Sequence, residues 1–200
     1  MIFIKTLTNQ VCFLETLQNM FGQYFDVPQE SFQQFQEILH ERNLQKGELW
    51  IQEGEVCGKL GFIGKGIMRS FYYRDKKDIT VSFSTKGEFV TSMSSFIAQK
   101  PSYESIEALD NCQVFELYYA DLMTLFERDR FLEHIYRLIL EQYYIELEEQ
   151  LIFAKFKSAK ERYLELMDNK PYIIQKASVG QVASYLDMSL ETLSRIRATI

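Results

Sequence analysis

The chain has 200 residues, of which 46% are hydrophobic and 25% are charged, and its formal net charge is −6. This size suits one large domain or two small ones, and the composition excludes a disordered or collagen-like chain. No run reaches the ~18 uncharged apolar residues of a membrane helix, and residues 1–5 are too short for a signal peptide. We therefore expect a soluble, cytoplasmic protein with no membrane partner.

The cysteines and histidines are few and scattered. Cys12, Cys57 and Cys112 contain no Cys-x-x-Cys pair, and His40 and His134 are the two histidines. This set excludes a disulfide framework and disfavours a zinc site or a Ser-His-Asp centre. We expect three thiols that pack as small apolar side chains, with no metal, no cofactor and no enzymatic activity.

Residues 10–42 have helical periodicity. Apolar residues such as Leu17 and Phe21 share one face in the first part, and Phe35 belongs to a second series that follows Pro28. Proline is favoured in the first turn of a helix, where its missing N–H costs nothing. The pattern predicts two helices.

Residues 44–118 change character, because seven glycines separate short runs typical of strands. These runs are Leu49–Ile51, Leu60–Ile63, Ile67–Tyr73, Ile79–Phe83, Ser105–Ala108 and Val114–Leu117. Their length and spacing predict a small antiparallel barrel or roll. The run Ile79–Phe83 alternates apolar and polar residues, so we expect one buried face and one wet face.

Residues 128–155 contain no proline or glycine, which predicts a helix of roughly 42 Å. Its apolar surface is too broad for burial on one side only. We expect it to pack on its own domain and on a second subunit, and an ordinary core helix is the alternative. The expected dimer interface consists of Leu132, Ile135, Tyr136, Ile139, Tyr143 and Leu147. A shorter helix, Ser158–Asp168, follows.

The segment 178–197 has the pattern of a helix-turn-helix. Ser178–Leu186 is amphipathic, with Val179, Val182, Ala183 and Leu186 on the expected inner face. A three-residue turn leads to Leu190–Arg197, with Ser189 as a natural N-cap and with Leu193 and Ile196 facing inward. A second helix of this kind enters the major groove of DNA, and a generic helical hairpin is the alternative.

The residues expected to face DNA divide into two groups. Glu191, Thr192 and Arg195, with Leu190 beside them, are expected at base edges, because arginine can pair with guanine and a carboxylate with cytosine. Ser189, Ser194, Arg197 and Lys176 are expected nearer the phosphates. The charge distribution agrees weakly, since residues 1–154 carry −9 (14 Lys and Arg, 23 Asp and Glu) and residues 155–200 carry +3 (8 against 5).

These motifs and their order resemble the Crp/Fnr family of bacterial transcription regulators. Lys46-Gly47-Glu48 and Glu53-Gly54-Glu55 resemble the start of the family's cyclic-nucleotide-binding β-roll, and the segment 62–72 resembles its central hairpin. Leu190-Glu191-Thr192-Leu193-Ser194-Arg195 is similar to the family's recognition helix. The resemblance implies a homodimer, a palindromic DNA operator, RNA polymerase as a partner and a small-molecule effector of unknown identity.

The chain departs from the family where cAMP-responsive members bind the cyclic phosphate. There a Gly-Glu pair binds the ribose and a later Arg binds the phosphate, whereas this chain has Thr91-Ser92 and Ser102, with Lys100 as the nearby cation. The candidate effector pocket consists of Ser92, Met93, Phe96, Ser102 and Tyr103. A short neutral serine cannot replace a guanidinium, so we expect no tight binding of cyclic nucleotides. The cysteine cluster of iron–sulfur members is also missing.

We therefore expect an α+β protein with three parts: a sensor-like roll with flanking helices over 1–127, a dimerisation helix over 128–155 and a DNA-binding helix-turn-helix over 156–200. Because three residues follow Arg197, we expect little room for the β-wing of this family. The alternative function is a ligand-binding or protein-interaction module that has the cyclic-nucleotide fold but does not bind DNA.

Overall fold

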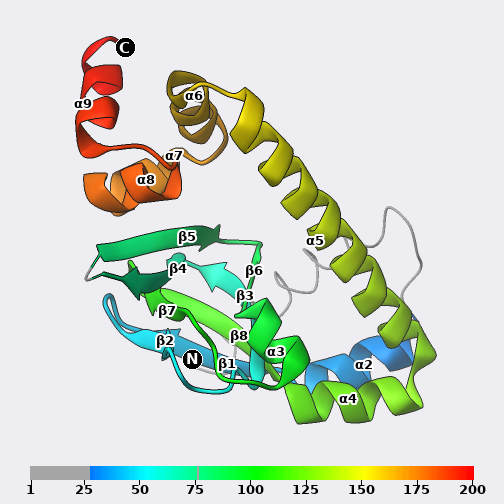
Figure 1. The fold of residues 1–200 in the computed structure, drawn as a ribbon. Helices are drawn as coiled ribbons and strands as arrows, with labels where there is room; N and C mark the ends of the chain where they lie inside the picture. Colours follow the sequence, from blue (N-terminus) through cyan, green and yellow to red (C-terminus); the bar gives the residue numbers. More distant parts are fainter. Residues whose placement is uncertain (1–27, 76) are drawn as a thin grey trace, which may run out of the picture.

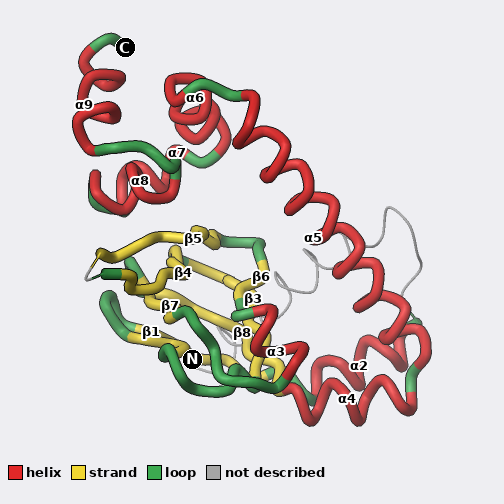
Figure 2. Tube along the Cα trace, viewed as in Figure 1, coloured by secondary structure: helices red, strands yellow, loops and turns green. Residues whose placement is uncertain are grey.

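The structure is a computed structural model that describes residues 28–75 and 77–200 (Figure 1). The first expected helix, before Pro28, lies outside the described residues. Strands form a roll, and helices lie at its two ends and along one side (Figure 2). The helices are α2 (Gln29–Glu37), α3 (Met93–Ala98), α4 (Tyr119–Arg128), α5 (Arg130–Phe156), α6 (Ala159–Asn169), α7 (Pro171–Lys176), α8 (Val179–Tyr185) and α9 (Leu190–Ala198).

Two antiparallel four-stranded sheets form the roll, which confirms the expected fold class. One sheet has the order β1-β8-β3-β6 and the other has the order β2-β7-β4-β5. The strands are β1 (His40–Leu44), β2 (Leu49–Ile51), β3 (Lys59–Lys65), β4 (Ile67–Arg74), β5 (Lys77–Thr85), β6 (Phe89–Val90), β7 (Ser105–Ala108) and β8 (Cys112–Tyr118). All six predicted strands are present, and β1 and β6 were not predicted.

Strand β1 replaces the end of the expected helical segment. Helix α2 ends at Glu37, and His40–Leu44 pairs with β8 in the register His40↔Glu116 to Leu44↔Cys112. The local periodicity favoured a helix here, but strand preference depends on the neighbouring strand more than on the segment itself. The partner β8 lies about 70 residues further along the chain, at Cys112–Tyr118, so the sequence of the segment carries no sign of it.

Two local features shape the hairpins of the roll. Gly66 connects β3 to β4 at φ +98°, and a Cβ there would lie 2.5 Å from Cys112 Sγ, so only glycine fits. Opposite Ser70 and Phe71, Val81 is an extra residue in β5. This bulge breaks the expected alternation, because Thr80 is buried while Val81 is 46% exposed.

Helix α5 begins at Arg130, where the Asp129 carboxylate accepts hydrogen bonds from the backbone N–H groups of Phe131 (2.9 Å) and Leu132 (3.2 Å). Its first turns are buried against the roll, with Ile135 in the main core. From residue 141 onward every described side chain of α5 is exposed. The helix thus connects the roll to α6 as a long arm (Figure 1).

The C-terminal helices form a second core. Val182, Ala183, Leu186, Leu193 and Ile196 are buried in it, which confirms their predicted inward orientation. The prediction for Val179 was wrong, since this residue is 40% exposed. It lies in the first turn of α8, whereas the helix contacts the roll further along, at Ser184 and Tyr185. Among the described residues, no helix is long and apolar enough to span a membrane.

Candidate functional site

Helix α9 begins where the sequence predicts it. The Ser189 side chain accepts a hydrogen bond from the Thr192 N–H at 3.1 Å, which confirms the N-cap. Leu193 and Ile196 anchor the helix in the second core. One face is therefore fixed, and the rest of the helix surface is open.

An arginine that the sequence reasoning missed fixes the turn between α8 and α9. Arg162 of α6 donates to the carbonyl oxygens of Leu186 (3.0 Å) and Asp187 (3.2 Å). These carbonyls end α8 and lack helical partners, so the guanidinium satisfies them. Asp187 has a left-handed backbone (φ +49°), which makes the turn tight. No local pattern marks this role of Arg162, because Leu186 and Asp187 lie about 25 residues away.

The outward residues of α9 form the candidate DNA surface. Leu190 is 50% exposed, Glu191, Ser194, Arg195 and Arg197 are exposed, and Thr192 is half-buried. The Ser189 hydroxyl lowers the pKa of the Glu191 carboxyl, so that group is negative at neutral pH. Arg195 contacts Thr192 at 3.5 Å, a long hydrogen bond that leaves the other guanidinium donors available.

Lys176 occupies a different place from the other predicted phosphate contacts. Its ammonium group lies 2.7 Å from a carboxylate oxygen of Asp110, a residue of the roll between β7 and β8. Tyr172 donates to the same carboxylate at 2.9 Å. Because Lys176 is engaged with the roll, we leave it out of the candidate DNA surface.

The residues predicted for the effector pocket differ in burial. Phe96 is 1% exposed and packs edge to face on Tyr119, so it belongs to the core, whereas Tyr103 is 61% exposed. The Ser92 and Ser102 hydroxyl groups are buried and lie 2.9 Å apart. The two serines are therefore neighbours in the fold, and their hydroxyl groups bind each other and offer no cation.

A buried carboxylate next to this pair was missed. Glu104 is 7% exposed, and its carboxylate accepts a hydrogen bond from the Ser92 hydroxyl. Burial raises the pKa of the Glu104 carboxyl. Burial also raises the pKa of the Tyr143 hydroxyl on α5, and the negative charge of Glu104 raises it further. When Glu104 is ionised, its charge would repel a phosphate at this position.

The residues predicted for the dimer interface divide between two environments. Leu132 and Ile135 are buried within their own chain, and Tyr136 and Ile139 pack partly against the same core. Tyr143 and Leu147, by contrast, are exposed by 39% and 44%. The main core, to which α4 and the roll both contribute, covers the first half of α5, whereas the described side chains of this helix from residue 141 onward are exposed.

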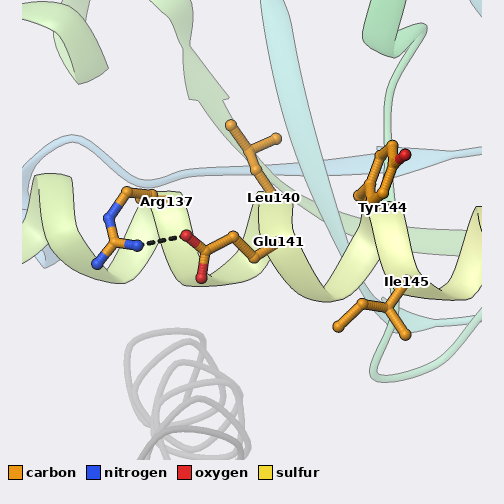
Figure 3. Close-up of a pocket in the computed structure, with 5 residues that line it drawn as sticks. All are labelled: Arg137, Leu140, Glu141, Tyr144 and Ile145. Atoms are coloured by element: carbon orange, nitrogen blue, oxygen red, sulfur yellow. Dashed lines mark hydrogen bonds and ion pairs between the residues drawn. The ribbon is translucent and has the colours of Figure 1, made fainter.

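An apolar stripe begins at the half-buried Leu140 and continues along the second half of α5. Figure 3 shows Leu140 and Tyr144 on the same side of α5, in a shallow groove that Arg137 and Glu141 border with an ion pair. Leu147 and Leu151 continue the stripe with the spacing 4-3-4 that helix pairs use. Tyr144 and Leu151 are 67% and 63% exposed.

Comparison with known proteins now adds the family of the roll. The cyclic nucleotide-binding domain family matches residues 41–129. The match spans the roll from β1 to the end of α4. No curated protein matches the chain in sequence.

Solved structures extend the likeness to nearly the whole chain. FixK2 from Bradyrhizobium japonicum has a TM-score of 0.68 at 17% identity, covering 81% of this chain and 84% of its own. A transcriptional regulator assigned to the Crp/Fnr family from Eubacterium rectale has a TM-score of 0.64 at 15% identity. The match covers 87% of this chain and 83% of that protein. The c-di-GMP-responsive global regulator CLP of Xanthomonas campestris has a TM-score of 0.62 at 19% identity. The match covers 86% of this chain and 91% of that protein.

The chain therefore has the Crp/Fnr-type fold, with the cyclic nucleotide-binding domain followed by the long helix and the helix-turn-helix. This confirms the resemblance found in the sequence. In the described part of the chain, no group of three or more His, Cys, Asp or Glu side chains is placed to hold a metal ion.

Proposed function

We propose that this protein is a homodimeric transcription regulator of the Crp/Fnr type that binds a palindromic DNA operator through α9. One observation carries the proposal: a capped helix is anchored by Leu193 and Ile196 and leaves Glu191, Arg195 and Arg197 exposed. A recognition helix needs this division between a buried anchor and side chains that can form hydrogen bonds with bases.

The second subunit is proposed to pair along the exposed half of α5. An apolar helical surface of this extent is unusual on a monomer and is typical of an interaction site. The stripe Leu140, Tyr144, Leu147 and Leu151 supports a coiled-coil contact between two copies. A two-fold dimer would present two α9 helices to two half-sites.

The roll is proposed not to respond to cAMP or cGMP. A buried phosphate must regain the interactions it loses from water, and this needs a cation or several donors. At the corresponding position, Ser92 and Ser102 bind each other and Glu104 adds a carboxylate. We expect cyclic nucleotides to bind only at about millimolar concentration or not at all, because a serine cannot replace a guanidinium.

Selection from a random library of DNA duplexes tests the function. The full chain should enrich a palindrome whose half-sites lie about one helical turn apart. The Arg195→Ala variant should enrich a palindrome with relaxed preference at one base position in each half-site, whereas Arg128→Ala, which removes an exposed arginine at the end of α4, should enrich the same palindrome as the parent. If the parent enriches no sequence, the alternative of a module without DNA binding is favoured. Titration calorimetry with cAMP tests the roll, and micromolar affinity would contradict our assignment.

A further inference from the structure

The helix-turn-helix and the roll share one apolar core. Ile67 of β4, Phe83 of β5 and Leu109 are buried in the same cluster as the inner residues of α6 to α9. The Phe83 and Tyr185 rings pack edge to face with their centroids 5.1 Å apart. The C-terminal helices are therefore attached to the rest of the chain through more than α5, because their core includes side chains of the roll.

The docked helix also covers an exposed edge of the roll. Strand β5 is the last strand of its sheet, so its outer N–H groups lack a strand partner. The Thr80 N–H donates to the Ser184 hydroxyl of α8 at 3.0 Å, and Thr80 is 4% exposed. This bond gives the contact a fixed register, which apolar packing alone does not specify.

Two ion pairs lie at the border of this interface. Asp110 accepts from Lys176 and Tyr172, as described above, and Glu88 lies 2.6 Å from the Lys170 ammonium. All four charged side chains are about one-third exposed. Partly exposed pairs add little net free energy, but opposite charges across an interface select one orientation and penalise others.

Helix α9 is free in this arrangement. It contacts α6 and α8, and α8 lies between it and β5 (Figure 1). Docking therefore leaves the side chains proposed to contact DNA exposed. Any rotation of the helix-turn-helix about the end of α5 would uncover Phe83 and Ile67 and would separate Asp110 from Lys176.

We infer that the roll holds the helix-turn-helix in its DNA-binding orientation without an effector, and that Asp110 acts as a positioning residue for α9 through Lys176. This inference rests on the proposed DNA-binding function. The roll then supports the helix-turn-helix in one position, and Lys176 binds Asp110 of its own chain in place of a DNA phosphate.

A charge exchange across the interface tests the inference in the full chain. The DNA probe is the duplex that the parent protein enriches from the random library. Asp110→Lys should weaken binding to this duplex about tenfold, within the range typical of coupling between two sites, because it places two ammonium groups together. The double variant Asp110→Lys/Lys176→Asp should restore the affinity. Glu55→Lys, with the same charge change at an exposed position of the roll, should have no effect.

Hydrogen exchange of the Thr80 amide reports docking without DNA. We expect slow exchange in the parent, faster exchange in Asp110→Lys and in Ser184→Ala, and recovery in the charge-exchanged double variant. Unchanged exchange in Asp110→Lys, or weak binding that the double variant does not restore, would overturn the inference. Tighter DNA binding by Asp110→Lys would also overturn it, because docking would then be inhibitory. If the parent binds no duplex, the DNA-binding proposal fails, whereas the exchange data still decide whether the docking exists.

Discussion

The charged side chains of α9 differ in what they can contact on DNA. A guanidinium in the major groove can form two hydrogen bonds with guanine, whereas one beside the backbone contacts phosphates of any sequence. Arg195 lies six residues after the N-cap Ser189, and Arg197 lies close to the end of the helix. We therefore expect the two arginines to contribute differently to affinity and to specificity.

Arg195→Ala should weaken operator binding by roughly 1–3 kcal/mol and relax the preference at one base position in each half-site. Arg197→Ala should weaken binding to all sequences alike and reduce its salt dependence, because fewer counterions are released. Binding titrations with the operator and with single-base variants, at several salt concentrations, distinguish these effects. Unchanged affinity and preference in Arg195→Ala would contradict the assignment of α9.

Glu104 provides a prediction on stability. Burial raises its pKa in the folded protein above the value of about 4.3 in an unfolded chain. The folded state then binds the proton more tightly, so the free energy of unfolding falls as the pH rises above about 4. Glu104→Gln removes this ionisation and should be more stable than the parent at pH 7, with a smaller advantage at pH 4.

Urea unfolding of both proteins at the two pH values checks this prediction. The matched control is Glu55→Gln, which removes an exposed carboxylate from the roll. An advantage of Glu104→Gln that is the same at pH 4 and pH 7 would show that ionisation of Glu104 is not its cause.

At the scale of elements, α5 has two halves with different roles. Its first half is buried against the roll, and its second half is exposed. A change at Ile139 would therefore disturb the fold of the single chain, because this residue packs against the main core. A test of dimerisation needs a residue that lies outside the core of its own chain, and Leu151 at 63% exposed is suitable.

Leu151→Asp should convert the dimer to a monomer, because it would bury an unpaired charge between the two helices. Its own fold should be unaffected, as judged by the helical circular dichroism. Sedimentation at concentrations where the parent is dimeric gives the result directly. Gln142→Glu adds the same charge to a different side of α5 and should remain dimeric. A parent that is monomeric at tens of micromolar concentration would contradict the proposed dimer contact along α5.

At the scale of the whole molecule, the shared core links the stability of the two parts. Trp50 is the single tryptophan and is buried in the roll, so its fluorescence reports the roll. Among the described helices, α5 to α9 contain most of the helical residues, so the helical ellipticity reports mainly this part. Because Phe83 lies in the core that joins the two parts, we expect the two signals to change together when the parent is unfolded in urea.

Phe83→Ala should lower the free energy of unfolding by about 3–5 kcal/mol, the usual cost of such a truncation in a core. It should also separate the two signals, with the helical signal lost at a lower urea concentration. Val81→Ala, at an exposed position of the same strand, should leave the two curves superimposed. Separate transitions in the parent would contradict a shared core.

The sequence by itself determined the local elements and their order. Short glycine-bounded runs predicted six strands, and the capping serine with the apolar spacing of residues 182–196 predicted the helix-turn-helix, because these signals act over a few residues. The tertiary structure alone decided which side chains meet across long separations: β1 with β8, Arg162 with the turn at Asp187, Glu104 beside Ser92, and Lys176 on Asp110. It also decided that the roll covers the first half of α5, which moved the proposed dimer contact toward Leu151. Such contacts depend on how distant segments pack, and no pattern within either segment encodes its partner.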